Sequence, residues 1–280
     1  MAGRLYLVPT PIGNPEDLSP RARDLLSRVD VVAAEDTRHF VTLARAHGLP
    51  ERALSLHDHN EAARVPQLLE RLQAGNDVAL VSDAGTPLIN DPGFKLVEAA
   101  VAAGFQVVSL PGPSAVTTAL AASGLPPVPF RFVGFPPRTA AKRRAFFESL
   151  AADPATLVCF EAPHRLRDTL RDARDTLSDR PACLARNLTK PHERYERGRL
   201  SEIEAALAAE DRVRGEATLI IGGASPDAIG PDTAAAAGDA GLLRAAGASS
   251  RTIAAFLTAR HGLSRRDAYR LAQERPTSHP

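Results

Sequence analysis

Residues 78–93 read VALVSDAGTPLINDPG, and this stretch contains the strand-to-helix transition that decides the fold. Residues 78–82 are mostly apolar without alternation, which is typical of a strand buried on both faces of a parallel sheet. The strand is predicted to end at Asp83, where a loop of small, cyclic and polar residues begins. Asp91-Pro92 then has the pattern of a helix N-cap with proline at the first helical position, and it predicts a helix to about Ala103.

The same order of elements repeats through the first part of the chain. Further strands are predicted at residues 4–9, 31–35, 53–57 and 106–110, and helices at 20–28, 37–47, 60–74 and from PGPSA to near Gly124. Ser19-Pro20 repeats the N-cap and proline pattern. Strands that alternate with amphipathic helices predict a parallel sheet covered by helices. We therefore predict an N-terminal α/β domain over residues 1–125.

A second α/β domain is predicted after the sequence GLPPVP at residues 124–129, which interrupts the pattern and indicates a domain boundary. Its predicted strands are residues 130–135, 156–162, 182–188, 193–200 and 216–223, and its predicted helices are 139–151, 164–177 and 201–209. This order of strands and helices is typical of a mixed α/β domain, which we place at residues 126–223.

The last part of the chain has a different composition. Residues 224–240 are rich in Ala, Gly, Pro and Asp, which predicts a linker, and a helical extension is predicted over residues 241–280. Two helices are expected there, at 249–262 and 264–274, with Gly262 ending the first and Ser264 capping the second. Such a pair is compatible with a helix-turn-helix or with a packed helical hairpin that does not bind nucleic acid, and the sequence leaves both open.

The overall composition excludes several classes of protein. The chain has 280 residues, with 34 Lys and Arg against 33 Asp and Glu, so its net charge of +1 argues against a histone-like polycation or an acidic disordered tail. The sequence has no apolar run near the ~18 residues of a membrane span, and its first residues lack the apolar stretch of a signal peptide. Cys159 and Cys183 are too few for a disulfide framework. We expect two buried, reduced thiols in a cytoplasmic protein without membrane contact.

The charge is unevenly distributed along the chain. Residues 1–130 carry 10 basic and 14 acidic side chains, and residues 145–239 carry 12 and 17. Residues 131–144 carry five basic side chains and no acidic one, and residues 240–280 carry seven and two. Local basic segments of this kind are where phosphate contacts are expected, although solvated helix faces would give the same pattern.

Three loops of the first domain concentrate small and cyclic residues: 9–14 (PTPIGN), 82–93 and 111–115 (PGPSA). Each follows a predicted strand, and ligands of open parallel sheets bind outside the carboxyl ends of the strands. The loops match neither the P-loop nor the G-x-G-x-x-G pattern, and they contain no Lys or Arg. We expect an apolar pocket with backbone donors and the carboxylate of Asp83, suited to a neutral or cationic ligand.

Polar residues follow two other predicted strands, as AEDTR at 34–38 and HDHN at 57–60. They form a candidate substrate-binding edge made of Glu35, Asp36, Arg38, His57, Asp58 and Asn60. His57, His59 and one carboxylate would be a possible zinc site, but two histidines without H-E-x-x-H spacing are a weak signal, and no metal is predicted. Asp36 and Asn60 are also placed to cap the helices that follow them, a role compatible with substrate binding.

EAPHR at residues 161–165 follows the predicted strand that contains Cys159. Glu161 is a candidate to hold a ribose hydroxyl, and it is equally placed to pair with Arg165. The sequence does not distinguish these two roles.

Several of these stretches occur in an order that resembles a known family. LVPTPIGN, AEDTR, LHDHNE, VSDAGTPLINDPG, LPGPSA and EAPHRL are similar to motifs of the ribosomal RNA small subunit methyltransferase I family, in the tetrapyrrole methylase superfamily. The resemblance spans about residues 4–223, and the C-terminal helices resemble the extension of that family. Tetrapyrrole methylases proper have a G-x-G-P-G loop where this sequence has PTPIGN, and Gly-Asp-Pro where it has Ser-Asp-Ala-Gly-Thr-Pro. Both differences favour the rRNA branch.

The resemblance implies two α/β domains, a parallel-sheet N-terminal one and a mixed-sheet C-terminal one, with S-adenosylmethionine in the cleft between them, usually in a homodimer. It implies 2′-O-methylation of a cytidine in the decoding region of 16S rRNA, with 16S rRNA and the small ribosomal subunit as partners. By motif position, the cofactor-binding residues are Pro11, Ile12, Asp83, Thr86, Pro87, Leu88, Ile89, Ser114, Ala115, Phe160, Asn187 and Ala217.

This chemistry needs alignment of the nucleophile with the methyl group at about 3–3.5 Å, which supplies much of the rate acceleration. A ribose hydroxyl is a poor nucleophile at neutral pH, so a general base or a positioned water is expected. The candidate bases are Glu35, Asp36, His57 and Asp58, with a preference for the last two. The candidate RNA-binding residues are Arg38, Asn60, Arg138, Lys142, Arg143 and Arg144.

Two other functions stay open at this point. A methyltransferase acting on a corrin- or sirohaem-type tetrapyrrole would not need the arginine-rich segments. A non-catalytic RNA-binding assembly factor would tolerate loss of the Asp83 loop, which is intact in this sequence.

Overall fold

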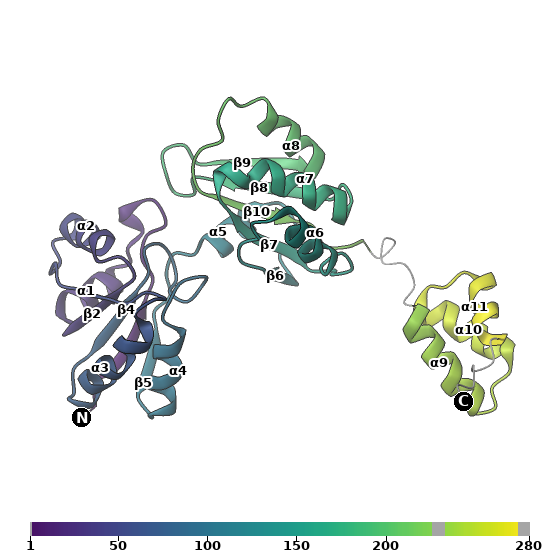
Figure 1. Ribbon diagram of the computed structural model, residues 1–280, viewed down its shortest axis with the longest axis horizontal. Coiled ribbons are helices and arrows are strands. Elements are labelled where there is room, and N and C mark those ends of the chain that lie inside the picture. Colours follow the sequence, from purple (N-terminus) through teal and green to yellow (C-terminus); the bar gives the residue numbers. More distant parts are fainter. Residues whose placement is uncertain (1, 226–232, 274–280) are drawn as a thin grey trace. The chain divides into compact units, whose positions relative to one another are not determined.

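The computed structural model of the protein describes residues 2–225 and 233–273. The chain forms two compact units, of which the first comprises the chain to Glu148 together with Ala155–Gly222. The second comprises Ser149–Pro154 and the chain from Gly223 onward. Both β-sheets belong to the first unit, and the last three helices belong to the second (Figure 1). The domain boundary at residue 125 lies inside the first unit and stays a prediction.

The N-terminal sheet is parallel, as predicted, and its five strands have the order β3-β2-β4-β1-β5. Their bounds are β1 Arg4–Val8, β2 Val31–Ala34, β3 Leu54–Ser55, β4 Val78–Val81 and β5 Gln106–Ser109. The strand β3 is shorter than predicted. Because β4 lies between β2 and β1, and β5 lies on the other side of β1, the carboxyl ends of β4, β1 and β5 are neighbours.

Helices cover both faces of this sheet. They are α1 Pro20–Arg28, α2 Thr37–His47, α3 Glu61–Gln73 and α4 Phe94–Ala102, with a short 3-10 helix, η1 Pro15–Asp17, before α1. Alternate strand residues point to opposite faces, so Tyr6 and Val8 pack with α1 and α2, while Leu5 and Leu7 pack with α3 and α4. The predicted cap of α1 is confirmed, because the Ser19 hydroxyl accepts a hydrogen bond from the Ala22 N–H at 3.1 Å.

The start of α4 differs from the prediction. The helix begins at Phe94 with Gly93 as its N-cap, and the Asp91-Pro92 pair does not cap it. Gly93 has φ 118°, a conformation that L side chains rarely adopt, and a Cβ there would lie 2.5 Å from Cδ2 of Leu80. Asp91 and Pro92 therefore belong to the loop, where the Asp91 side chain is available for another role.

The C-terminal sheet is mixed and has the order β6-β7-β10-β8-β9. Its strands are β6 Phe130–Phe132, β7 Thr156–Glu161, β8 Pro181–Arg186, β9 Arg194–Arg199 and β10 Ala217–Ile221, and only β6 and β7 pair in parallel. The helices of this part are α6 Ala140–Glu148, α7 Leu166–Leu177 and α8 Leu200–Ala208, with the 3-10 helix η2 Pro163–Arg165. Helix α7 packs between α6 and α8.

Helix α5 (Ala115–Ala122) joins the two sheets within the first unit. Its residues Val116, Ala119 and Leu120 share a buried cluster with Val158 of β7 and Ile220 of β10. Ile12 and Leu188 belong to the same cluster, so the loop after β1 and the segment after β8 also meet there. This packing fixes the edge of the N-terminal sheet against the C-terminal sheet.

The second unit contains α9 Thr233–Ala245, α10 Ser250–His261 and α11 Arg265–Gln273. Helix α9 corrects the prediction of a linker at 224–240: residues 233–240 are helical, while residues 226–232 lie outside the described residues. Alanine has the highest helix propensity, and Ala236 and Ala240 pack in a core that the three helices share. Gly262 ends α10 and the Ser264 hydroxyl accepts from the Asp267 N–H, as predicted.

Two further sequence expectations concern the thiols and the membrane. Cys159 and Cys183 are buried free thiols, as predicted, and burial raises the pKa of both. Among the helices in residues 2–225 and 233–273, we find none that combines the length and the apolar character needed to cross a bilayer.

Glu61 at the start of α3 holds the start of α4, which generates a stability prediction. It is 5% exposed, and its Oε1 accepts hydrogen bonds from the N–H groups of Gly93 and Lys95 at 3.1 and 2.9 Å. A carboxylate at a helix N-terminus also interacts favourably with the helix dipole. We expect Glu61→Ala to lower the free energy of unfolding by about 1–3 kcal/mol in urea titrations, because two donors lose their acceptor.

The matched control is Glu70→Ala, at an exposed position of the same helix. It should change the free energy of unfolding by less than about 0.5 kcal/mol. Equal losses in the two variants would show that Glu61 acts only through the helix propensity of α3.

Candidate functional site

The three loops with small and cyclic residues follow the neighbouring strands β4, β1 and β5, and they are hydrogen-bonded to one another. Thr10 and Gly85 exchange two backbone hydrogen bonds of 2.9 Å. The Thr10 hydroxyl donates to the carbonyl oxygen of Ser82, and the Thr86 hydroxyl donates to that of Pro113, both at 3.0 Å. The three loops therefore form one layer at the carboxyl edge of the sheet, as the sequence predicted.

Glycines permit this close approach. Gly85 has φ 85°, and a Cβ at Gly112 would lie 2.6 Å from the Cβ of Pro9. Leu88 and Asn90 also have a positive φ of 73°, which is strained for residues other than glycine. Such strain often concentrates at functional sites, and here it falls within residues 82–93.

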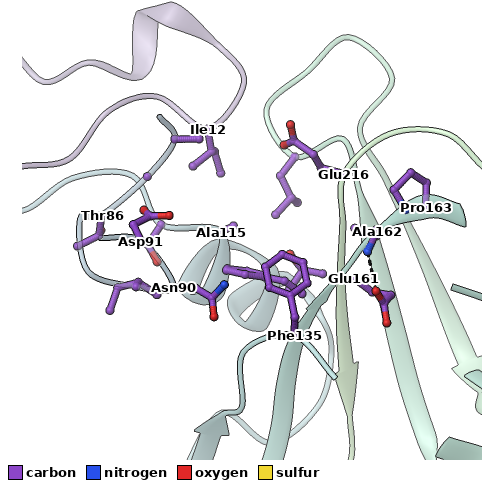
Figure 2. Close-up of a pocket in the computed structure, with 18 residues that line it drawn as sticks. Ile12, Thr86, Asn90, Asp91, Ala115, Phe135, Glu161, Ala162, Pro163 and Glu216 are labelled. Carbon is purple, nitrogen blue, oxygen red and sulfur yellow. Dashed lines mark hydrogen bonds between the residues drawn. The ribbon is translucent and has the colours of Figure 1, made fainter. Parts of the chain in front are cut away.

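A cavity of about 410 Å³ lies between this loop layer and the C-terminal sheet, a size typical of small-molecule sites. One side consists of Ile12, Ala84, Gly85, Thr86, Ile89, Asn90, Asp91, Ser114 and Ala115. The other side consists of Phe135, Phe160, Glu161, Ala162, Pro163, Leu188, Glu216, Ala217 and Thr218. Figure 2 shows residues of the two sides facing each other across the cavity. Most of the lining is apolar, as predicted for these loops.

Seven of the twelve residues predicted to bind the cofactor line this cavity: Ile12, Thr86, Ile89, Ser114, Ala115, Phe160 and Ala217. They come from the loops after β1, β4 and β5 and from the strands β7 and β10. Their assembly is a property of the tertiary structure, because the residues are spread over more than two thirds of the chain.

Five predicted cofactor residues do not line the cavity: Pro11, Asp83, Pro87, Leu88 and Asn187. Leu88 packs against the core of the N-terminal sheet, and Pro87 is buried. Asp83 is directed to the region after β2, where it accepts from the Asp36 N–H at 3.0 Å and lies 3.2 Å from Nδ1 of His39. Asn187 precedes Leu188, which does line the cavity.

Asp91 and Phe135 are the most informative lining residues that the sequence analysis did not assign to the site. Asp91 lies within the distinctive stretch 82–93, but its position before a proline predicted a helix cap. Phe135 was predicted only as part of a strand, and its ring centroid lies 5.6 Å from that of Phe160. The cavity therefore has carboxylates in its wall, as expected, but they are those of Asp91, Glu161 and Glu216, and Asp83 does not line it.

Carboxylates gather beside the cavity at the carboxyl ends of β2 and β4. Burial, with the negative charges of Glu35 and Asp83 and against a lowering hydrogen bond from Ser82, raises the pKa of Asp91 to about 7. Burial also raises the pKa of Glu35, together with the charges of Asp83 and Asp58. A carboxyl group that titrates near neutrality can take up a proton during a reaction at physiological pH.

Asp36 has a different environment from Glu35. Its carboxylate pairs with Arg38, whose Nε lies 3.0 Å from Oδ1, and hydrogen bonds from Arg38 hold the pKa of Asp36 well below its usual range. Oδ1 also accepts from the Arg38 N–H at 2.8 Å, so the predicted capping of α2 is confirmed. These contacts make Asp36 a weak candidate for a base, while the Arg38 side chain stays 88% exposed.

The HDHN loop is organised by Asn60. Its Oδ1 accepts from the His57 N–H at 2.8 Å, and its Nδ2 donates to the carbonyl oxygen of Ser55 at 3.2 Å. Asn60 is the N-cap residue of α3, but its side chain makes no capping hydrogen bond. The amide is thus used within the loop, which argues for a structural role.

Glu161 forms the ion pair that the sequence left as one of two options. Its Oε1 lies 3.3 Å from Nε of Arg165 and accepts from the Ala162 N–H at 2.8 Å, while Oε2 accepts from the Thr169 hydroxyl at 2.5 Å. The side chain is fully buried, and both oxygens are engaged within the protein. This geometry favours a structural role over the binding of a ribose hydroxyl.

The basic segment 131–144 contains one misassigned residue. Arg143 is 4% exposed and pairs with Asp172, with Nη2 2.6 Å from Oδ2, so the prediction that it contacts RNA is wrong. A buried guanidinium cannot reach a phosphate, and its helical position on α6 points it toward α7. Arg138, Lys142 and Arg144 are exposed, although Nε of Arg144 also lies 2.9 Å from Asp172.

Within residues 2–225 and 233–273, no three His, Cys, Asp or Glu side chains are grouped so that they would hold a metal ion.

The fold and the cavity agree with comparisons to known proteins. The family model described as Tetrapyrrole (Corrin/Porphyrin) Methylases matches residues 4–204. The chain belongs to this family of methylases.

The relatives within the family are more specific. A protein of Micromonospora olivasterospora named "Ribosomal RNA small subunit methyltransferase I" is 50% identical over 277 residues, which cover 98% of this chain and 88% of that protein. A protein of the same name from Escherichia coli O157:H7 is 47% identical over 223 residues, which cover 79% of this chain and 78% of that protein. The chain therefore groups with the ribosomal RNA branch of its family, as its motifs predicted.

Solved structures support the same fold. Uroporphyrin-III C-methyl transferase from Thermus thermophilus, complexed with S-adenyl homocysteine, has a TM-score of 0.55 and 24% identity, covering 79% of this chain and 97% of that chain. A diphthine synthase has a TM-score of 0.58 and 16% identity, and the match covers 79% of this chain and 90% of that chain. At these identities the similarity is one of fold.

Proposed function

We propose that this protein transfers a methyl group from S-adenosylmethionine to the ribose 2′-hydroxyl of a cytidine in the decoding region of 16S rRNA. The observation that carries the proposal is the apolar cavity with Asp91 in its wall, in a chain half identical to proteins named for methylation of small-subunit rRNA. The choice of cytidine and of its 2′-oxygen rests on the motif resemblance.

The residues of the cavity fit S-adenosylmethionine. The rings of Phe135 and Phe160 and the side chains of Ile12 and Leu188 provide an apolar surface for an adenosine group. Asp91 provides a negative charge suited to a cationic ligand, and the lining contains no Lys or Arg. When bound, S-adenosylmethionine supplies an electrophilic methyl group on a positively charged sulfur.

Asp91 is the residue we propose as the general base. Its carboxylate would accept the proton of the ribose 2′-hydroxyl as the oxygen forms its bond to the methyl carbon and the carbon–sulfur bond breaks. Burial is the main cause that raises the pKa of Asp91 to about 7, and the negative charge of Glu35 adds to it. His57 and Asp58 stay candidate bases and candidates for contacts with the substrate, while the ion pair with Arg38 argues against Asp36 as a base.

The exposed cations support an RNA substrate. Arg138, Lys142 and Arg144 lie in the segment that leads from the cavity wall into α6, and Arg38 lies near the acidic edge. We propose these side chains as phosphate contacts. Exposed arginines also occur on α10 and α11, among them Arg251, Arg265 and Arg266, and we propose that they act as a second basic surface that contacts RNA.

We further propose that the protein is cytoplasmic and acts as a homodimer, as the resemblance implies. Phe94 and Val101, seven residues apart on α4, are 66% and 60% exposed. Large apolar side chains on one helix face are more stable when a partner covers them, which supports a dimer surface there.

The direct test is a methylation assay with tritiated S-adenosylmethionine on 30S subunits that lack the modification, with free 16S rRNA as the comparison. We expect label on one cytidine ribose, located by nucleotide mapping. Label on a base would refute the 2′-oxygen as the acceptor, and transfer to a tetrapyrrole but not to either RNA would refute the rRNA substrate.

The proposed base predicts a pH dependence. A carboxyl group with a pKa of about 7 accepts a proton only when ionised, so kcat should rise with pH through about 7 and level off above it. Asp91→Asn should lower kcat on the order of 10²–10⁴-fold and remove this rise. Glu35→Gln should keep activity but move the rise to lower pH, because a charge that raises the pKa of Asp91 is gone. An unchanged profile in both variants would exclude Asp91.

The proposed phosphate contacts predict a salt dependence. Replacing Arg138 and Lys142 by Gln should weaken binding to 30S subunits and reduce the slope of log K against log salt by about 0.7–0.9 for each lost contact. Arg28→Gln is the matched control, because this exposed arginine ends α1 just before β2, at the opposite edge of the sheet. If the wild-type protein, the variant at Arg138 and Lys142, and Arg28→Gln have equal slopes, these two side chains do not contact RNA phosphates. The same measurement on Arg265→Gln with Arg266→Gln tests the second basic surface.

A further inference from the structure

The cavity wall that contains Phe135 is built on an unusual loop. Residues 133–139, VGFPPRT, connect β6 to α6, and two prolines in the middle of the loop have no N–H to donate. The loop begins as an extension of β6. The Val133 N–H donates to the carbonyl oxygen of Val158, and the carbonyl oxygen of Gly134 accepts from the Phe160 N–H. Beyond Gly134 the loop needs other groups to fix its course.

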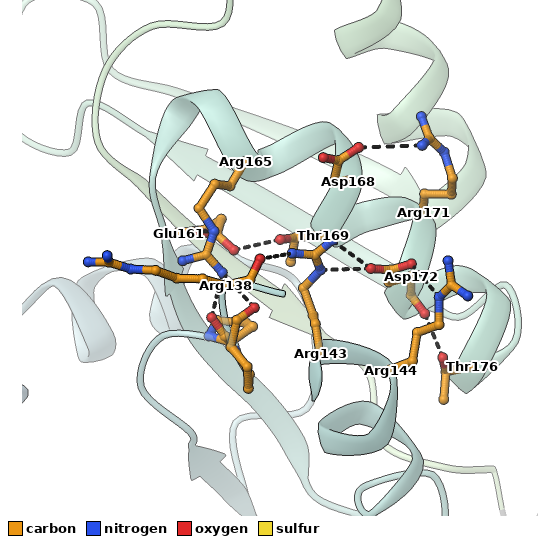
Figure 3. A network of polar contacts seen from close by, with 12 residues as sticks. Arg138, Arg143, Arg144, Glu161, Arg165, Asp168, Thr169, Arg171, Asp172 and Thr176 are labelled. Carbon is orange, nitrogen blue, oxygen red and sulfur yellow. Dashed lines mark hydrogen bonds and ion pairs between the residues drawn. The ribbon is translucent and has the colours of Figure 1, made fainter. Parts of the chain in front are cut away.

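Two arginine side chains bind the backbone of the loop beyond Gly134. Nη2 of Arg165 donates to the carbonyl oxygens of Pro136 and Pro137 at 2.5 and 2.9 Å. Nη1 of Arg143 donates to the carbonyl oxygen of Arg138 at 3.1 Å. Three consecutive carbonyl oxygens are therefore held by two guanidinium groups, which Figure 3 shows together with their partners.

Each arginine is in turn held by a buried carboxylate. Arg165 pairs with Glu161, which also accepts from the Thr169 hydroxyl, and Arg143 pairs with Asp172. The carboxylates belong to β7 and α7, so the loop is attached to the rigid part of the C-terminal sheet. The contact of Arg143 with Asp172 is a charge-assisted hydrogen bond of 2.8 Å, stronger than a neutral one, whereas Arg165 and Glu161 form an ion pair with Nε 3.3 Å from Oε1.

The loop places different side chains on two sides. Phe135 lines the cavity, where its ring meets the edge of Phe160, and Gly134 passes so close to Asn90 that a Cβ would lie 3.0 Å from Oδ1. Three residues after Phe135, the side chain of Arg138 is exposed. A shift of the loop would therefore move both the cavity wall and a proposed RNA contact.

We propose that Arg165 is a positioning residue of the cofactor site. Arg143 has the same role through the carbonyl oxygen of Arg138. Arg165 does not line the cavity. It acts by fixing the Pro136-Pro137 backbone, so that Phe135 covers the adenosine group and Arg138 faces RNA. The inference rests on the proposed cofactor site, and it assigns a function to the ion pair of Glu161 beyond fold stability.

The test compares Arg165→Met with Arg167→Met. Arg167 is a matched control two residues further along, in the first turn of α7; it is also half-buried, and its Nη2 donates to the carbonyl oxygen of Leu207 at 2.8 Å, away from the loop. Both variants lose hydrogen bonds from a guanidinium to carbonyl oxygens, and urea unfolding measures the stability of each. Calorimetry with S-adenosylhomocysteine should show a Kd raised at least about tenfold in Arg165→Met and changed less than about twofold in Arg167→Met.

A second readout needs no ligand. The chain contains no tryptophan, so Phe135→Trp introduces a single fluorophore into the cavity wall. Phe135 is 48% exposed, so the indole is half-buried at the start. In this background Arg165→Met should shift the emission to longer wavelength, because the released loop takes the indole out of contact with Phe160, while Arg167→Met should leave it unchanged. If the wild-type protein does not bind S-adenosylhomocysteine, the proposed function fails, yet the emission still tests the loop.

Milder variants cover the case in which Arg165→Met does not fold. Thr169→Val removes the hydroxyl that holds Glu161, and Arg165→Lys keeps the charge but loses the planar group that spans two carbonyl oxygens. Both should give smaller changes of Kd and emission in the same direction. The inference is overturned if folded Arg165 variants and Thr169→Val have the Kd and the emission of Arg167→Met.

Discussion

The pair of backbone hydrogen bonds between Thr10 and Gly85 is the interaction on which the site depends. It joins the loop after β1 to the loop after β4, and it is possible because Gly85 has a positive φ and lacks a Cβ that would press on Ile12. Once the two loops are joined, the Thr86 hydroxyl reaches the loop after β5. The residues that line the cavity from the N-terminal side are consequently fixed by backbone geometry and need few side-chain contacts.

The opposite side of the cavity is fixed by charge instead. In the loop after β6, Pro136 and Pro137 have no N–H to donate, and the carbonyl oxygens of residues 136–138 are bound by Arg143 and Arg165. A buried guanidinium is stable only with a paired carboxylate, which Asp172 and Glu161 provide. The cavity thus combines a rigid backbone layer with a wall held by ion pairs.

Much of the fold was predictable because its signals are local. The apolar runs of β1, β4 and β10, the cap at Ser19 and the turn at Gly262 depend on nearest neighbours, and the structure confirms them. The errors arose where a local pattern met a tertiary constraint. Asp91-Pro92 has the pattern of a cap, yet the helix begins at Phe94 with Gly93 as its N-cap, because the backbone there passes close to Leu80. Arg143 looks like a surface cation, yet it is buried against Asp172.

The sequence by itself determined the alternation of strands and helices, the family and the apolar character of the ligand loops, since these depend on residue type and order. The tertiary structure decided which residues meet. The strand order β3-β2-β4-β1-β5 makes three distant loops neighbours, and it brings Asp91 close enough to Glu35 for their charges to interact. The pKa of a carboxyl group depends on its burial and on nearby charges, and neither is encoded in its local sequence.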